Sequence, residues 1–260
     1  MTSHRSASRR ATSALTGLLL AGTLAACGSD GDSADTADGA GRLTVLSAAS
    51  LSDVFAELGT EFAREHDGAT VRFSFGSSTD LAEQVADGAP GDVLATADEA
   101  SMRLAEEAGV TGDVVTLATN VLTIVTPPDN PAGIESLDDL ENSTWVRCTD
   151  EAPCGRVATA VLAANDISAE PASLEEDVRA TLDKVVSGEA DAGLVYATDA
   201  VAAGDGVTTV AIPGAESELT SYLMTDLEQA VDAALAREWI EFVTSAEGLA
   251  ILEEAGFGTP

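Results

Sequence analysis

Three adjacent hydroxyl side chains, Ser77, Ser78 and Thr79, are the first residues whose types and spacing suggest chemistry. They lie in the segment RFSFGSSTDLAEQV, between a short apolar run and a helical pattern. A nucleophile, a helix cap formed by Ser78 or Thr79, and an anion site are all compatible with such a cluster. A helix N-terminus after a strand favours an anion, because unpaired N–H groups and the positive end of the helix dipole face outward there.

The small number of histidines disfavours nucleophilic catalysis. A Ser/His/Asp arrangement needs a histidine as its base, and beyond the N-terminal segment the chain has only His66, at the end of an amphipathic helical pattern. FGSSTD also lacks the second glycine of a G-x-S-x-G turn. Acidic runs at 138–139 and 175–177 begin predicted helices, where carboxylates act as caps. We therefore predict that the protein is not an enzyme and carries no cofactor.

Two of the three cysteines, Cys148 and Cys154, lie close together in RCTDEAPCGR. In an oxidising compartment a disulfide between them is the natural outcome. A catalytic redox pair is the alternative, although such pairs more often have C-x-x-C spacing at a helix N-terminus. A metal site is disfavoured, because no histidine lies nearby.

Residues 1–27 have the pattern of an export signal. A basic segment, HRSASRR, precedes an apolar run that is too short to span a bilayer of about 30 Å with ease. The run ends in LAAC, which resembles the lipobox of bacterial lipoproteins and predicts lipidation of Cys27; an ordinary signal peptide is the alternative. Residues 28–41 contain no large apolar side chain and are predicted to be a flexible linker. We expect an exported protein, anchored by lipid to the outer face of the cytoplasmic membrane.

The chain is strongly acidic, with a formal net charge of -33. Nucleic-acid binding requires basic side chains that neutralise phosphates, so this class of function is excluded. Most of the acids fall on the polar faces of predicted helices, which indicates a solvating surface. Such acids are screened over about 8 Å at physiological salt, so they do not preclude an anion site in a cleft.

Strands and helices alternate from residue 42 onward. LTVLSAAS, TVRFSF and GDVLATAD are predicted strands, separated by amphipathic helical patterns, and NVLTIVTPPDNP is the next predicted strand. Such alternation implies parallel βαβ units. The same pattern then repeats, so we predict two α/β lobes, each a mostly parallel sheet flanked by helices. One lobe comprises residues 42–120 and 217–260 and the other residues 121–216, with crossings near Asn120 and Ser221.

Helix starts preceded by small or hydroxyl residues occur in four segments, SAASLSD, GSSTDL, APCGR and LEEDVR. Helices that follow parallel strands direct their N-termini toward the carboxyl edge of the sheet, where open α/β folds bind ligands. Each start alone is compatible with ordinary capping. Two lobes that face each other would bring all four to one cleft.

Several segments resemble, in order and spacing, the molybdate-binding proteins of ABC transporters. They are LTVLSAASLSDVF, FSFGSSTDLAEQVADGAPGDVLATAD, APCGRVATAVL, LEEDVRATLDKVVSGEADAGLVYATDA and AEGLAILEEAGF, between Leu43 and Phe257. The resemblance implies a two-lobed type II periplasmic-binding-protein fold that closes on molybdate or tungstate in the cleft between the lobes. It also implies delivery to a membrane permease driven by a cytoplasmic ATPase. We expect a monomer.

The oxyanion ligands of that family correspond to five positions of this sequence. The serine of its A-A-S-L segment corresponds to Ser50, the middle serine of its strand-to-helix turn to Ser78, and its V-Y tyrosine to Tyr196. Backbone N–H groups make the other contacts, at Cys154 in the P-A-G turn and at Val178 in the D-V-R helix start. Cys154 replaces the usual alanine, a change that a backbone contact tolerates.

Molybdate is fully ionised at neutral pH, so hydroxyl and N–H donors suit it. Sulfate and phosphate remain rival ligands. Phosphate is partly protonated and would require a carboxylate acceptor, for which Asp80 is the candidate at the strand-to-helix turn; we predict that Asp80 faces solvent. A ferric-ion carrier using Tyr196 and Tyr222 is a different class, although the adjacent tyrosine pair of such carriers is missing. A thiol-redox protein using Cys148 and Cys154 is the remaining alternative.

Overall fold

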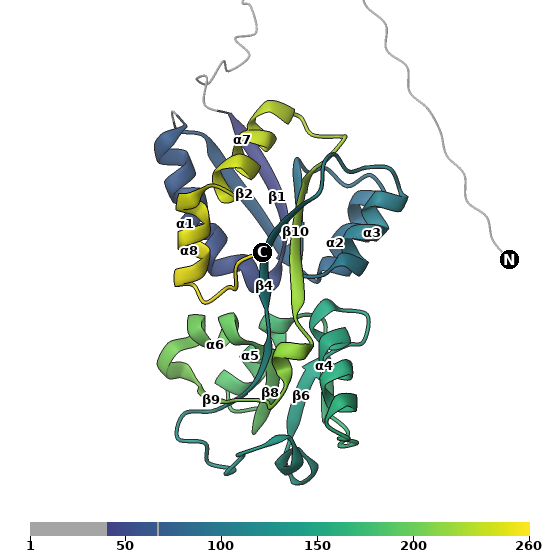
Figure 1. Cartoon of the computed structure of the whole chain (residues 1–260), viewed down its shortest axis with the longest axis vertical. Coiled ribbons are helices and arrows are strands. Elements are labelled where there is room, and N and C mark those ends of the chain that lie inside the picture. Colours follow the sequence, from purple (N-terminus) through teal and green to yellow (C-terminus); the bar gives the residue numbers. More distant parts are fainter. Residues whose placement is uncertain (1–40, 67) are drawn as a thin grey trace, which may run out of the picture. The chain divides into compact units, whose positions relative to one another are not determined.

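The computed structural model describes residues 41–66 and 68–260, which contain two five-stranded sheets (Figure 1). The predicted export signal, the lipidation site Cys27 and all but the last residue of the predicted linker lie outside the described residues. No helix within the described residues is long and apolar enough to cross a membrane. Each sheet with its helices is called a lobe below.

Lobe 1 contains the sheet with strand order β2-β1-β3-β10-β4. Strand β1 pairs in parallel with β2 and β3, whereas β10 is antiparallel to both β3 and β4. The strands are β1 (Arg42–Ala48), β2 (Thr70–Gly76), β3 (Val93–Thr96), β4 (Val115–Asn120) and β10 (Thr220–Asp226). The helices are α1 (Ser52–Glu65), α2 (Ser78–Ala86), α3 (Glu99–Glu107), α7 (Ala233–Val243) and α8 (Ala246–Glu254).

Two apolar layers cover the two faces of this sheet, whose central strands β1 and β3 are largely buried, whereas the edge strand β2 is partly exposed. Helices α1, α7 and α8 lie over one face, and α2 and α3 over the other (Figure 1). An aromatic cluster forms the larger layer, in which Trp239 contacts Phe55 and Phe62 edge to face. Residues such as Phe62, which is fully buried, each stabilise the fold by about 3 to 5 kcal/mol relative to alanine.

Lobe 2 contains the sheet with strand order β7-β6-β8-β5-β9. Strand β6 is parallel to β7 and β8, and β5 is antiparallel to β8 and β9. The strands are β5 (Leu122–Thr126), β6 (Trp145–Cys148), β7 (Ser173–Glu175), β8 (Ala192–Tyr196) and β9 (Thr208–Val210). The helices are α4 (Pro153–Ala164), α5 (Val178–Val186) and α6 (Ala197–Ala203), and the short 3-10 turns of the described residues are η1 (Ala49–Leu51), η2 (Leu137–Asn142), η3 (Gly204–Gly206) and η4 (Ala215–Ser217).

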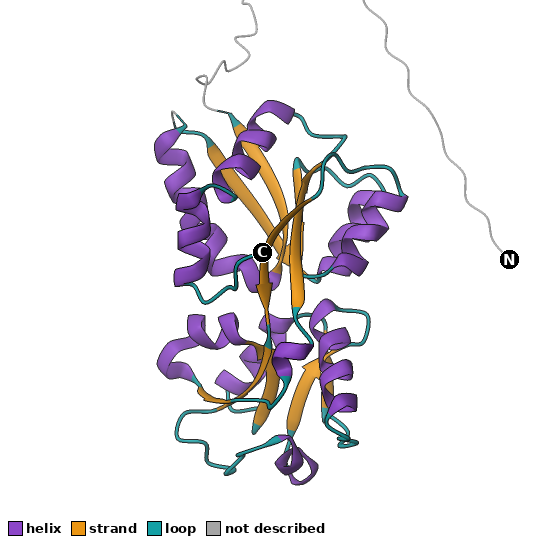
Figure 2. Cartoon of the chain, in the orientation of Figure 1, coloured by secondary structure: helices purple, strands orange, loops and turns teal. Residues whose placement is uncertain are grey.

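Both sheets are mixed, although the alternation of elements predicts mostly parallel ones. The antiparallel pairs arise where the chain passes between the lobes, at β4 to β5 and again at β10 (Figure 2). The prediction overlooked β4, because half of its residues are polar (Thr116, Thr119 and Asn120) and only Val121 separates it from β5. It also extended the strand AGLVYATDA too far, since helix α6 begins at Ala197.

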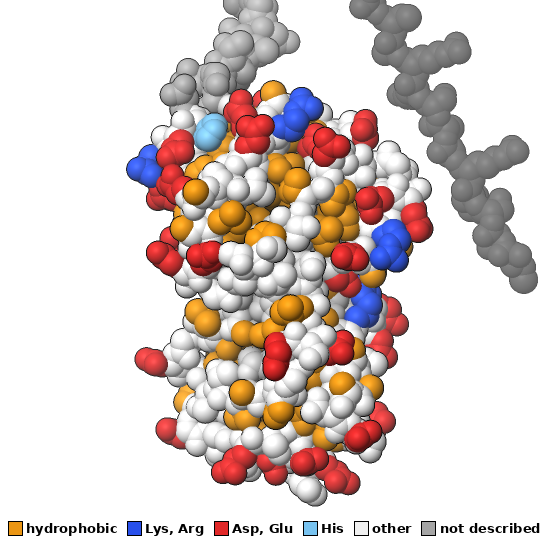
Figure 3. Space-filling model, in the orientation of Figure 1, with side chains coloured by type: hydrophobic (Ala, Val, Ile, Leu, Met, Phe, Trp, Pro, Cys, Tyr) orange, Lys and Arg blue, Asp and Glu red, His pale blue; other side chains and the backbone are white. Residues whose placement is uncertain are grey.

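Acidic side chains are spread over the visible surface of both lobes, and few basic ones lie among them (Figure 3). This distribution agrees with a solvating surface, as the sequence pattern indicates. Asp80 is among the exposed acids, so the prediction that it faces solvent is confirmed.

Candidate functional site

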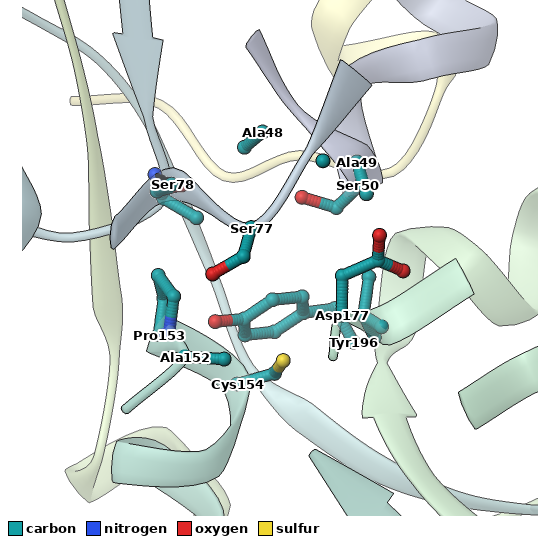
Figure 4. Close-up of a pocket in the computed structure, with 13 residues that line it drawn as sticks. Ala48, Ala49, Ser50, Ser77, Ser78, Ala152, Pro153, Cys154, Asp177 and Tyr196 are labelled. Carbon is teal, nitrogen blue, oxygen red and sulfur yellow. Dashed lines mark hydrogen bonds between the residues drawn. The ribbon is translucent and has the colours of Figure 1, made fainter. Parts of the chain in front are cut away.

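One cavity lies where turns and helix starts of the two lobes meet (Figure 4). All five residues that the family resemblance assigns to the ligand line it: Ser50, Ser78, Cys154, Val178 and Tyr196. The other lining residues are Ala48, Ala49, Gly76, Ser77, Ala97, Ala152, Pro153 and Asp177. The four helix starts singled out in the sequence therefore converge, because each follows a strand whose carboxyl end points to the same place.

The cavity is small. Water centres can occupy about 10 Å³ of it, which is about the space of one water molecule. A tetrahedral anion with four oxygen atoms is larger than water, so its entry requires the two lobes to separate. The structure thus represents a closed arrangement of the lobes around the cavity.

Ser78 lines this cavity with a hydroxyl group. The side chain is 1% exposed, and its Oγ accepts a hydrogen bond of 2.9 Å from the backbone N–H of Ala97. A hydroxyl whose oxygen already accepts such a bond remains free to donate its own hydrogen. The capping interpretation was wrong: Ser77 is the N-cap of α2 and makes no side-chain cap bond, and the Thr79 hydroxyl donates instead to the carbonyl of Glu151, at 2.7 Å.

Ser50 lies in the turn η1 and is buried. Its Oγ is 2.8 Å from the hydroxyl oxygen of Tyr222, a residue of β10 that is distant in the sequence. The amide Nδ2 of Asn120 in turn lies 3.3 Å from the Tyr222 hydroxyl. A chain of hydrogen bonds therefore runs from Asn120 through Tyr222 to Ser50, and of these three residues only Ser50 lines the cavity.

Tyr196 provides a third hydroxyl, which lies between Ser77 and the turn at Pro153 (Figure 4). The side chain is 1% exposed, and its Oη makes no hydrogen bond of normal geometry to the described residues. The hydroxyl of Thr220 lies near enough to lower the pKa of Tyr196 slightly, but it donates its own hydrogen to the carbonyl of Ala97. Burial, more than the nearby Tyr222 and acids, raises the pKa of Tyr196 well above its ordinary value. The phenol therefore stays protonated, and a buried donor is available for a ligand.

Backbone N–H groups complete the set of donors. Cys154 lies in the first turn of α4, where N–H groups have no acceptor within the helix. At the start of α5, the Oδ1 of Asp177 accepts from the N–H groups of Arg179 and Ala180, at 2.8 and 2.9 Å. The Asp177 side chain does not cap the N–H of Val178, the first residue of α5, which lines the cavity.

Residues 43–258 match the family of bacterial extracellular solute-binding proteins. The chain is 37% identical over 255 residues to the molybdate-binding protein ModA of Mycobacterium tuberculosis, in an alignment that covers 96% of this chain and 97% of that relative. The chain belongs to the bacterial extracellular solute-binding protein family.

Solved structures of other solute-binding proteins confirm the predicted two-lobed α/β fold. The periplasmic molybdate-binding protein of Azotobacter vinelandii superposes with a TM-score of 0.73 at 22% identity, covering 84% of this chain and 99% of that chain. The sulfate-binding protein SubI of Mycobacterium tuberculosis has a TM-score of 0.74 at 19% identity, covering 84% of this chain and 86% of that chain. At these identities the likeness concerns the fold alone.

In this solute-binding protein a disulfide joins Cys148, at the end of β6, to Cys154 in the first turn of α4. The next residue, Gly155, packs directly on the turn between them. A Cβ on Gly155 would lie 1.7 Å from the carbonyl oxygen of Thr149, so only glycine fits this approach. The covalent link and the close contact together hold the N-terminus of α4 against the cavity.

Two arginines of the solute-binding protein connect the lobes, and sequence reasoning missed both. Arg156 of α4 pairs with Asp98 at 2.7 Å and donates to the Ser101 hydroxyl at 2.9 Å. Arg179 of α5 pairs with Asp53 of α1 at 2.7 Å. Because each pair joins a helix of lobe 2 to lobe 1, both favour the closed arrangement. Nothing in the local sequence pattern distinguishes these arginines from surface cations.

Arg179 also lies 3.4 Å from Asp199, a completely buried carboxylate whose Oδ2 accepts from the backbone N–H of Tyr196. Burial raises the pKa of Asp199 to about 7, and the attraction of Arg179 opposes this rise. Asp199, whose pKa lies close to neutral pH, is therefore a titratable group in the first turn of α6, and it contacts the backbone of the cavity residue Tyr196.

Proposed function

We propose that this protein is the extracytoplasmic solute-binding component of an ABC transporter and that it binds molybdate, with tungstate as a second ligand. The lobes close on the anion, and the loaded protein delivers it to a membrane permease driven by a cytoplasmic ATPase. The relative named for molybdate binding, 37% identical over nearly the whole chain, supports this ligand. The anion is the cargo of the protein, and the proposal includes neither a catalytic step nor a resident cofactor.

The observation that carries the proposal is the buried hydroxyl of Tyr196, which makes no hydrogen bond to any residue that the structure describes and lies in a cavity with other donors. The Ser78 oxygen already accepts from a backbone N–H, so this hydroxyl also donates. Molybdate offers only acceptors at neutral pH, and each hydrogen bond to a charged acceptor contributes about 1.5 to 3 kcal/mol. The helix starts at Cys154 and Val178 add positive ends of helix dipoles without the desolvation of a cation.

A protonated phosphate fits this arrangement poorly, because it needs an acceptor for its hydrogen. Asp80 is exposed. Asp177 is the one carboxylate among the lining residues, and its Oδ1 is engaged in capping α5. Sulfate, which is also fully ionised, remains the second candidate ligand, since SubI has the same fold. Selection between the two anions then depends on the size that the cavity takes when an anion is bound.

The two other classes are not favoured. Ferric carriers of the class considered bind iron through ionised tyrosines, whereas burial raises the pKa of both Tyr196 and Tyr222. Within the described residues, no group of three or more His, Cys, Asp or Glu side chains is placed to hold a metal ion. Cys148 and Cys154 are disulfide-bonded and buried, so they are poorly accessible for thiol exchange.

We further propose that the protein is exported, carries lipid on Cys27 and acts as a monomer. The LAAC segment after an apolar run supports the lipid anchor, and residues 28–41 would hold the folded unit away from the membrane. Mass spectrometry of the membrane fraction tests this directly. An unmodified Cys27, or a mature chain that begins elsewhere, would contradict the anchor.

Calorimetric titration with molybdate, tungstate, sulfate, phosphate and ferric citrate tests the ligand. We expect binding of molybdate and tungstate, and a large loss of molybdate affinity when Ser50→Ala and Ser78→Ala are combined. Ser74→Ala, which removes an exposed hydroxyl from the neighbouring strand β2, is the matched control and should leave the affinity unchanged. Binding of phosphate without molybdate, or an unaltered affinity in the double variant, would overturn the proposal.

A further inference from the structure

The hydrogen bonds behind Ser50 have a defined direction. The Oδ1 of Asn120 accepts from the backbone N–H of Val121 at 3.0 Å, which sets the orientation of the amide. Its Nδ2 consequently faces the hydroxyls of Thr198 and Tyr222, at 2.8 and 3.3 Å. An amide nitrogen only donates, so the Tyr222 oxygen accepts from Asn120.

The hydrogen of the Tyr222 hydroxyl must then be directed to another acceptor. The Oγ of Ser50, at 2.8 Å, is the remaining hydrogen-bond partner of Tyr222 within the described residues. Burial raises the pKa of Tyr222, so the hydroxyl keeps its hydrogen. Ser50 therefore accepts from Tyr222, and its own hydrogen is free to point into the cavity that it lines.

We propose that Tyr222, oriented by Asn120, is a positioning and specificity-determining residue that makes Ser50 a donor to the bound anion. This inference rests on the proposed function and deepens it. With one lone pair of its oxygen engaged by Tyr222, Ser50 directs its hydrogen toward the ligand and is a weaker acceptor for it. The contact therefore favours fully ionised oxyanions over those that carry a proton at that position.

The oxygen of Ser78, like that of Ser50, accepts a hydrogen bond, but its donor is a backbone group. That donor is the N–H of Ala97, which no side-chain substitution removes. The donor behind Ser50 is a side chain, so it can be deleted. Tyr222→Phe removes only the hydroxyl and retains the ring, which packs edge to face against Phe257 with centroids 5.3 Å apart.

Deletion of this donor should have two measurable consequences. The hydrogen of Ser50 loses its fixed direction, so we expect the Kd for molybdate to rise about tenfold, as for the loss of one well-oriented hydrogen bond. The lone pair of Ser50 that Tyr222 engages is also released, so the Ser50 oxygen accepts more readily from a protonated ligand. We therefore expect the ratio of the phosphate Kd to the molybdate Kd to fall. The fall should be strongest at about pH 6, where a larger fraction of the phosphate is doubly protonated.

A double-mutant cycle by calorimetry tests whether Tyr222 acts through Ser50. Wild type, Tyr222→Phe, Ser50→Ala and the double variant are titrated with molybdate and with phosphate. We expect Tyr222→Phe to raise the molybdate Kd about tenfold when Ser50 is present and less than twofold in the Ser50→Ala background. Equal losses in both backgrounds, or no loss with Ser50 present, would overturn the inference.

Asn120→Asp provides a second test if Tyr222→Phe folds poorly. A carboxylate at this position accepts from Tyr222, which reverses the chain of hydrogen bonds and makes Ser50 donate to Tyr222. Repulsion between the new charge and the anion acts in both backgrounds, so the relay predicts a larger loss of molybdate affinity with Ser50 present than in the Ser50→Ala background, and equal losses would refute it.

The wild-type titrations separate this inference from the proposed function. A wild type that binds sulfate but not molybdate refutes the ligand assignment alone, and the cycle with sulfate then decides the role of Tyr222. A wild type that binds none of molybdate, tungstate and sulfate refutes both. Molybdate binding that responds equally to Tyr222→Phe in both backgrounds refutes only the inference.

Discussion

Replacement of Tyr196 by phenylalanine should weaken ligand binding without weakening the fold. The ring is buried and lies edge to face with Tyr222, with centroids 6.1 Å apart, and phenylalanine retains this contact. The substitution removes only Oη, which has no partner among the described residues. A buried hydroxyl without a partner costs about 1 to 3 kcal/mol. The unfolding free energy of the ligand-free variant should therefore equal or exceed that of the wild type.

The loss of affinity follows from the bond that Oη would make. A hydrogen bond to a charged acceptor contributes about 1.5 to 3 kcal/mol, so the Kd for molybdate should rise about 10- to 150-fold. Burial raises the pKa of Tyr196 well above its ordinary value. The hydroxyl thus stays protonated, and the ratio of the two Kd values should be constant between about pH 6 and pH 9.

Calorimetry with molybdate and thermal unfolding with and without the anion measure both quantities on the same samples. The ligand should raise the unfolding temperature of the variant less than that of the wild type at equal concentration. A Kd within about twofold of the wild-type value would refute the assignment of Tyr196 as a ligand. A large drop in the unfolding temperature of the ligand-free variant would refute the argument from the unpartnered hydroxyl.

Three further predictions concern stability and closure. Burial raises the folded-state pKa of Asp199 to about 7, above its ordinary 3.8, so its contribution to stability is full below about pH 4 and is lost as the pH rises through about 7; Asp199→Asn should flatten this decline in thermal unfolding, and an unchanged pH profile would contradict it. Arg156→Ala removes the interlobe pair with Asp98 and should raise the molybdate Kd a few-fold, chiefly through faster dissociation in stopped flow; an unchanged dissociation rate would contradict the role of this pair in closure. Replacing Cys148 and Cys154 together by serine should lower the unfolding free energy by about 2 kcal/mol in denaturant titrations while molybdate binding persists; a folded variant that no longer binds would contradict a purely structural disulfide.

The segment FGSSTDL illustrates how much of the site local sequence predicts. The strand and the helix around it are correct, because apolar periodicity and the small residues between them are local signals. The capping role assigned to Ser78 or Thr79 was wrong. The Ser78 hydroxyl meets the N–H of Ala97 and that of Thr79 meets the carbonyl of Glu151, and both partners lie far along the chain. A local pattern cannot anticipate such competition for a hydroxyl.

The mixed character of the sheets and the missed strand have a related cause. β4 and β5 are separated by Val121 alone, and β4 mixes apolar residues with threonines and ends at Asn120. The hydrophobic pattern therefore gives no separate signal for a strand before β5. Whether such a stretch pairs within one sheet or passes from one sheet to another depends on the strands that flank it, which come from elsewhere in the chain.

The amino-acid sequence by itself determines the order of helices and strands, the acidic surface and the types of donor available, because periodicity, charge and capping residues act over a few neighbours. The tertiary structure decides which way those donors point. Ser50 becomes a donor through Tyr222 and Asn120, and Arg156 and Arg179 become links between the lobes, only because folding brings together residues that are distant in the sequence. The direction of a hydrogen bond depends on its partner, and the partners here are supplied by the fold.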